Sequence, residues 1–114
     1  MYGWDAARQA CPAGWHLASD AEWTALVNYA GGDEKAGKKL KARSGWSKNN
    51  HGTDDYGFSA LPGGSAGGNG HYNLGYEGNW WSATKSSWYM KYDDEGVGRY
   101  DDAGYESSVR CVQD

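Results

Sequence analysis

The sequence predicts a single α+β domain over residues 1–114, with two main helices on a small, mostly antiparallel sheet and long irregular loops. A chain of this length can build one core but not two. Its 18 Gly and 2 Pro predict many tight turns. One strongly amphipathic segment is followed by several short alternating segments, which fits an α+β domain better than a helical bundle.

A short helix is expected close to the N-terminus, with Asp5 as its N-cap. Trp4, Ala7 and Cys11 would share one face of this helix at i, i+3 and i+7. Pro12 prevents the helix from continuing because it lacks a backbone N–H and clashes with the preceding turn.

A three-residue strand is expected at residues 15–17. A capping box from Ser19 to Glu22 then begins the most clearly marked helix. Its apolar stripe, at i, i+3, i+4 and i+7, consists of Trp23, Leu26, Val27 and Ala30. The glycines at 31–32 end this helix. A third, shorter helix is expected over residues 34–41, with its lysines in water.

Residues 58–62 predict a brief strand that stops at Pro62. Five glycines in residues 63–70 argue against any regular element there. Residues 93–96 carry a hairpin signal. Four later strands are expected, at residues 79–84, 88–92, 97–100 and 108–112.

The two cysteines, Cys11 and Cys111, lie near opposite ends of the chain. If they pair, they close a loop of about 100 residues, which the chain-entropy model values at about 4–5 kcal/mol. Two reduced thiols in the core are the alternative. We favour the disulfide, and with it an oxidising location, extracellular or on the surface of a cell or virion.

The net charge of −4 argues against nucleic acid as the main partner. No apolar run is long enough to span a membrane and no signal-peptide pattern occurs, so direct membrane insertion is not expected. Six of the eleven cations lie within residues 35–48, a stretch that we interpret as a solvated helix face.

Aromatic residues are concentrated toward the C-terminus: the chain has 7 Trp and 9 Tyr against 1 Phe, and nine of these 17 lie within residues 72–105. Residues 75–114 combine them with Asp, Ser and Gly, the composition of a displayed binding surface between two anchored strands. The core is expected to take Trp15, Trp23, Trp46 and Trp81. Exposed turns are expected to carry Tyr72, Tyr76, Trp80, Tyr100 and Tyr105.

The candidate ligand-binding residues are Tyr76, Trp88, Tyr89, Lys91, Tyr92, Asp93, Asp94, Arg99, Tyr100, Asp101, Asp102, Tyr105 and Glu106. The tyrosines would provide contact area, and the charged side chains would orient the ligand. The alternative is that these aromatics replace missing aliphatic residues in the core.

Catalytic chemistry is weakly marked. His16, His51 and His71 have no partner at a recognisable spacing and no G-x-S-x-G elbow occurs, so an enzyme is not expected. The carboxylates within residues 93–106 are candidate calcium ligands, but they form no D-x-D-x-D-G loop. We interpret these residues as acidic turns that keep the tips of the hairpins soluble, and no cofactor is expected.

The order W-x-x-A-x-x-x-C, then GWHLAS, then a capped helix with E-W, resembles the opening of C-type lectin-like domains. Five blocks in order, CPAGWHLASDAEW, AGKKLKARSGW, HGTDDYGFSALPGG, WWSAT and SVRCV, resemble the Fibrobacter succinogenes major paralogous domain family over nearly the whole chain. This family's members usually carry a further N-terminal strand region, which is missing here.

The resemblance implies the C-type lectin-like fold, shared with formylglycine-generating enzymes, and a disulfide that joins Cys11 at a helix end to Cys111 on the last strand. It also implies a secreted or surface-attached bacterial module. Variable proteins of diversity-generating retroelements use the same fold to display a randomised C-terminal patch. The Glu-Pro-Asn and Gln-Pro-Asp tripeptides of calcium-dependent lectins and the reactive cysteine pair of the enzymes do not occur, so neither activity carries over.

We therefore expect a non-catalytic recognition module, an adhesin-like domain that binds a protein or glycan at a cell, pilus or phage surface, with its C-terminal surface open to retroelement diversification. The first alternative is a calcium-dependent carbohydrate-binding module, and the second is a relative of the formylglycine-generating enzymes.

Overall fold

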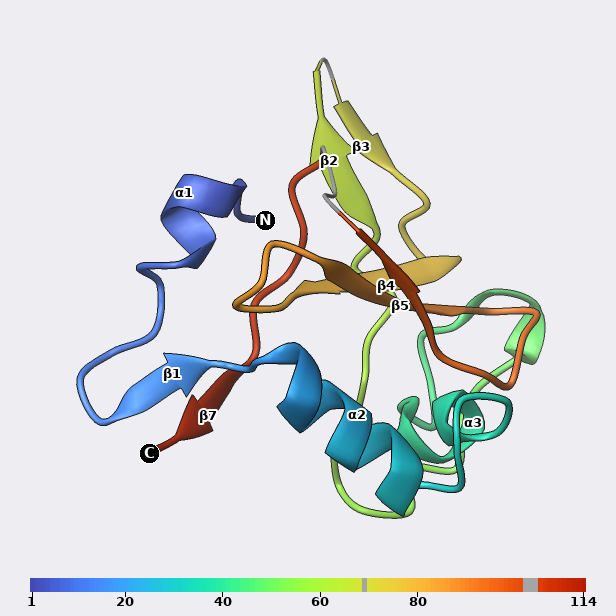
Figure 1. The fold of residues 1–114 in the computed structure, drawn as a ribbon. Coiled ribbons are helices and arrows are strands. Elements are labelled where there is room, and N and C mark those ends of the chain that lie inside the picture. The colour runs from blue at the N-terminus through green and yellow to red at the C-terminus, as the bar shows by residue number, and fades with distance from the viewer. Residues whose placement is uncertain (69, 102–104) are drawn as a thin grey trace.

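The computed structural model describes residues 1–68, 70–101 and 105–114 (Figure 1). Its helices are α1 (Trp4–Ala7), α2 (Asp20–Tyr29) and α3 (Ala36–Leu40), with a 3₁₀ turn at Ser47–Asn49. Its strands are β1 (Trp15–Leu17), β2 (Ser65–Gly67), β3 (Gly70–Tyr72), β4 (Glu77–Trp81), β5 (Ser87–Lys91), β6 (Gly98–Tyr100) and β7 (Cys111–Gln113). Short helices with antiparallel strands make this a small α+β fold, as the sequence predicts.

The strands pair into three antiparallel sheets within the described residues: β4-β5-β6, β1-β7 and β2-β3. In the largest sheet, Trp88 of β5 lies opposite Trp80 of β4 and Arg99 of β6. Figure 1 shows α2 and α3 below this sheet, while β2 and β3 project above it. The sheet therefore has a covered inner face and an outer face.

Trp23 on α2 is the centre of the main core. Its ring stacks on Trp88 with 5.8 Å between centroids and lies 6.0 Å from Trp80. Each such aromatic pair adds about 1 kcal/mol beyond the burial of its area. The prediction that Trp80 lies in an exposed turn is therefore wrong, because α2 supplies a ring for it to pack against.

A smaller core lies between α1, β1 and β4. It consists of Ala7, Leu17 and Trp81, with the ring of Trp4 5.4 Å from that of Trp81. The disulfide between Cys11 and Cys111 closes this region, and we thus confirm the predicted pairing. The segment after α1 is tied in this way to β7, which pairs with β1.

Helix α2 follows its sequence signals closely. The side chain of Ser19 accepts a hydrogen bond from the backbone N–H of Glu22, whose carboxylate accepts one from the backbone N–H of Ser19. Trp23 and Val27 are buried, and the backbone turns into a left-handed conformation at Gly31. The capping box and the apolar stripe are both confirmed.

Other local predictions are wrong. Gly3, not Asp5, is the N-cap of α1, and the helix ends at Ala7, so Cys11 lies beyond it. Trp15 is 43% exposed because β1 is paired only with the short β7 at the rim of the fold. Lys41 is buried, with 3% exposed, because its ammonium group finds backbone carbonyls as acceptors.

The glycine-rich segment forms a hairpin, contrary to prediction. Strands β2 and β3 pair with each other, and the backbone of Ala66 exchanges two hydrogen bonds with that of Glu106. Pairing from both sides compensates for the entropic cost of glycine in a strand. Residues 58–62 form no strand in the described structure and contribute one bridge, between Lys41 and Ala60. Residues 108–112 are strand only from Cys111 onward.

His16 of β1 links three parts of the chain: its Nε2 lies 2.8 Å from the Glu22 carboxylate of α2, and its Nδ1 lies 2.7 Å from the Asp114 carboxylate. These two hydrogen bonds raise the pKa of His16. Hydrogen bonds from the Ser19 backbone and from His16 lower the pKa of Glu22. The arrangement is therefore most stabilising where the carboxylates are charged and the imidazole is protonated.

We expect the titration midpoint of His16 to fall toward the ordinary histidine value in Glu22→Gln, because the glutamine keeps the cap but loses the negative charge. A raised pKa in the folded state means that this contribution is present at low pH and lost as pH rises through that pKa. NMR titration of the imidazole protons measures the midpoint. An unchanged midpoint in Glu22→Gln would contradict the assignment.

Candidate ligand-binding site

The outer face of the main sheet carries a stacked pair of tyrosines. Tyr89 of β5 and Tyr100 of β6 lie with their ring centroids 4.5 Å apart at 22°, and the Lys91 ammonium is 5.3 Å from the Tyr89 ring. The Tyr89 ring lies across Gly98, where a Cβ atom would come within 2.1 Å of it. Glycine at this position therefore allows the ring to lie flat on β6.

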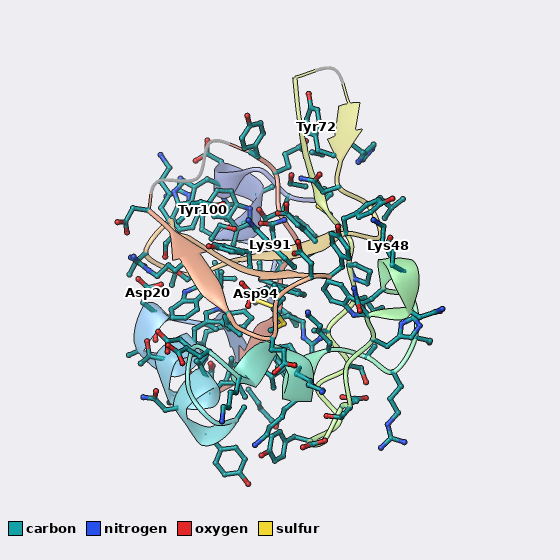
Figure 2. All side chains as sticks on the ribbon, turned by 90° about the vertical axis from the view of Figure 1, so that its right-hand side faces the viewer. Asp20, Lys48, Tyr72, Lys91, Asp94 and Tyr100 are labelled. Atoms are coloured by element: carbon teal, nitrogen blue, oxygen red, sulfur yellow. A yellow bond between two sulfur atoms is a disulfide. The ribbon has the colours of Figure 1, made fainter. Side chains whose placement is uncertain are left out.

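A second tyrosine pair lies at the β2-β3 hairpin. Tyr72 of β3 and Tyr105 meet edge to face with 6.1 Å between ring centroids. They are 46% and 60% exposed, and Tyr100 is 49% exposed. In Figure 2, Tyr72 lies above Tyr100 and Lys91. We name Tyr72, Tyr89, Lys91, Tyr100 and Tyr105 the tyrosine face.

The third pair lies elsewhere. Tyr92 continues the alternation of Trp88 and Met90 and therefore belongs to the inner side of the sheet, where it packs against the edge of the main core. Its ring meets Tyr76 edge to face at 5.2 Å, and the Lys48 ammonium is 5.7 Å from it. The structure thus divides the predicted binding surface into two places.

Trp88 does not contribute to the tyrosine face. Its ring is 8% exposed, and its indole N–H donates to Asp20 at 2.8 Å. This position corrects the prediction that Trp88 contacts ligand, because the side chain points inward from β5 onto Trp23. Arg99, also predicted to orient ligand, donates to Asp20 from Nε at 3.0 Å and from Nη2 at 2.8 Å.

Asp20, the first residue of α2, is the acceptor that joins this helix to the sheet. It also accepts a hydrogen bond from the Ser86 hydroxyl at 2.6 Å. Partial burial would raise the pKa of Asp20, but hydrogen bonds from Arg99, Ser86 and Trp88 outweigh this effect and hold the pKa well below its ordinary value. The carboxylate therefore stays charged, in a role within the fold.

The acidic residues of the predicted surface have varied roles. The Asp101 carboxylate lies 2.6 Å from Arg99, that of Glu95 lies 3.7 Å from Lys38, and that of Asp94 accepts the Gly96 backbone N–H at 2.8 Å. The predicted site residue Asp102 lies outside the described residues. Within residues 1–68, 70–101 and 105–114, no three His, Cys, Asp or Glu side chains are grouped to hold a metal ion.

A polar pocket of about 420 Å³ lies where α3 faces the turns at 48–51 and 92–95. Of its lining residues, Tyr92, Asp93 and Asp94 belong to the predicted surface, whereas Asn49, Asn50 and His51 lie outside it. Their turn-rich sequence carries no signal that pairs it with residues more than 40 positions later. Tyr72, expected only as an exposed turn residue, and Lys48 are also absent from the predicted ligand contacts.

Lys41 lies at the floor of this pocket. Its ammonium group donates to the carbonyl of Lys91 and, at 2.6 Å, to that of Asp94, and it lies 4.9 Å from the Trp46 ring. Burial lowers the pKa of Lys41, and the carboxylates of the 93–95 turn oppose this effect. The lysine therefore fixes the shape of that turn.

The family model of the Fibrobacter succinogenes major domain matches residues 1–113. No curated protein and no solved structure matches the chain. Among the described residues, no helix has the length and apolar character that a membrane crossing requires. Since the match spans nearly all 114 residues, the chain belongs to the Fibrobacter succinogenes major domain family.

Proposed function

We propose that this domain is a non-catalytic recognition module that binds a protein or glycan at a cell, pilus or phage surface through the tyrosine face. The observation that carries the proposal is the stacked Tyr89–Tyr100 pair, held by Gly98 beneath and by Lys91 beside it. Rings fixed in this way lose little entropy on binding and offer large amphipathic area.

The proposal includes a C-type lectin-like fold and an extracellular location. The fold is supported by the order of elements, in which a cysteine that follows the first helix is tied to the last strand and β1 pairs with β7. The location is supported by the disulfide, which persists in oxidising compartments. Cys11 and Cys111 are both used in this disulfide, which leaves neither as a free thiol for chemistry of the formylglycine-generating type.

The test uses the double variant Tyr89→Ala with Tyr100→Ala, which removes two rings from the centre of the tyrosine face. Since a buried hot-spot tyrosine is worth about 2 kcal/mol, we expect binding to fall by about two to three orders of magnitude. The matched control is Tyr29→Ala with Tyr56→Ala, another exposed ring pair, 5.0 Å apart near the end of α2.

Binding is measured with the labelled domain on a glycan array and on intact bacterial cells by flow cytometry. Equal binding by the Tyr89/Tyr100 variant and the unmodified domain would refute the assigned face, and a loss in the control variant would show that the effect is nonspecific. If calcium raises the Tm and EDTA reverses the rise, the calcium-dependent alternative replaces this proposal.

A sharper form of the proposal is that a retroelement diversifies the codons of the C-terminal surface. Its support is the density of Tyr, Asp and Ser within residues 87–108. A downstream near-copy of this segment that differs at adenines, beside a reverse transcriptase gene, would support it. A genome that has neither would refute it and leave the broader proposal intact.

A further inference from the structure

We propose that the polar pocket between α3 and the turns at 48–51 and 92–95 is a separate, calcium-independent binding site for a neutral saccharide unit. This site goes beyond the proposed function. The tyrosine face lies on the outer side of the sheet, whereas the pocket lies beyond the end of β5, beside Tyr92, which packs against the core. A volume of about 420 Å³ falls in the range of small-molecule sites and accommodates one or two sugar rings.

The walls of the pocket are built before any ligand arrives. The backbone N–H of Lys38 in α3 donates to the Glu95 carbonyl at 3.0 Å, and the N–H of Thr53 donates to the Lys38 carbonyl at 2.8 Å. The Lys41 ammonium holds the Lys91 and Asp94 carbonyls from below. Because the 92–95 turn and the segment that follows the 48–51 turn are tied to α3, binding requires little ordering of the backbone.

Close backbone packing keeps this arrangement in place. A Cβ atom at Gly37 would lie 2.2 Å from the Gly96 carbonyl oxygen, and one at Gly52 would lie 2.3 Å from the Lys41 carbonyl oxygen. Helix α3 and Lys41, the residue after it, therefore pack at glycines against the backbone that directly follows each turn. The backbone therefore fixes the shape of the pocket, and the side chains on its rim determine which ligand it binds.

The rim offers both donors and acceptors. The side-chain amides of Asn49 and Asn50 have no hydrogen-bond partner within the described parts of the chain, and each amide both donates and accepts. His51 accepts the Trp46 backbone N–H at Nδ1, 3.2 Å away, so in the neutral ring Nε2 carries the proton and donates. Sugar hydroxyls, which also donate and accept, match this set.

The charges around the pocket favour a neutral ligand. Three carboxylates, on Asp93, Asp94 and Glu95, are balanced by the ammonium groups of Lys38, Lys41 and the neighbouring Lys48. A charged ligand would be attracted by the groups of opposite charge and repelled by those of like charge. A hydroxyl, in contrast, can donate to the carboxylates and accept from the ammonium groups. Tyr92 adds an aromatic wall for the C–H groups of a sugar ring.

The test uses ¹H–¹⁵N NMR of the whole domain with four neutral disaccharides as probes: cellobiose, maltose, lactose and N,N′-diacetylchitobiose, each added to millimolar concentration in EDTA. We expect at least one probe to shift the amides of residues 49–51 and 93–95. Asn50→Ala should weaken that binding about tenfold, the loss expected for one or two hydrogen bonds. The matched control, Asn28→Ala, changes an exposed asparagine on α2 and should bind as the unmodified domain does.

The outcomes separate this site from the tyrosine face. If no probe shifts the pocket amides, or if Asn50→Ala binds a probe as tightly as the unmodified domain does, the saccharide site is refuted. Shifts confined to Tyr89 and Tyr100, abolished by Tyr89→Ala with Tyr100→Ala, would refute the pocket and support the tyrosine face. Shifts of the pocket amides that occur with calcium present but not in EDTA would refute calcium independence.

Discussion

Replacing both cysteines, Cys11→Ser with Cys111→Ser, is expected to lower the free energy of unfolding by about 4 kcal/mol. The bond spans 100 positions, so its removal releases nearly the whole chain in the unfolded state. A domain of this size is stabilised by only about 5–15 kcal/mol in total. Urea unfolding followed by tryptophan fluorescence measures the difference.

Reduction of the unmodified domain should lower the urea midpoint as much as the double substitution does, since both remove the same constraint. Single substitutions should behave like the double variant once intermolecular disulfides are blocked. Equal midpoints for the oxidised domain and the double variant would contradict the expectation. They would show that the chain is as ordered without the bond as with it.

Asp20→Ala is expected to cost about 3 kcal/mol of stability, because it leaves the Trp88 indole N–H without its acceptor and removes the carboxylate that binds the Ser86 hydroxyl and Arg99. Asp5→Ala is the matched control: this carboxylate is 89% exposed, lies in the first turn of α1 and contacts Arg8 at 3.5 Å. An exposed pair of this kind is worth less than about 1 kcal/mol. Thermal unfolding of the two variants measures both effects.

Asp20 also sets a pH dependence. Its pKa is lowered in the folded state, so its contribution is complete above the pKa of an unfolded aspartate, about 3.9, and is lost as pH falls through the folded value. We expect the stability of the unmodified domain to fall more steeply below about pH 4 than that of Asp20→Asn. Parallel pH profiles would contradict the role of Asp20 as a charged acceptor.

The sequence predicts features whose causes are local. The capping box from Ser19 to Glu22 and the stripe that includes Trp23 define α2 within ten residues of chain, and the structure reproduces both. The alternation that predicts a strand over 88–92 is likewise visible in consecutive side chains and corresponds to β5 at Ser87–Lys91. The exposure of Tyr100 and Tyr105 is also predicted correctly, although Tyr100 lies on strand β6 and not in a turn.

Features with distant causes are not predictable in this way. Trp88 is buried because it stacks on Trp23, 65 positions earlier in the chain. The carbonyls that bind the Lys41 ammonium are 50 and 53 positions away in the chain. The residues around Lys41 therefore predict an exposed lysine at the end of a helix. The pocket is lined by α3 and by two turns more than 40 positions apart in the chain, and nothing in the sequence of either turn indicates the other.

The disulfide has a mechanical consequence. Cys11 precedes β1 and Cys111 begins β7, so a force that pulls on the chain outside this pair passes through the sulfur–sulfur bond and bypasses the residues between them. Helices α2 and α3 and strands β2 to β6 lie inside the closed loop and carry none of that tension. A domain built this way can hold its shape under drag and shear on its ends.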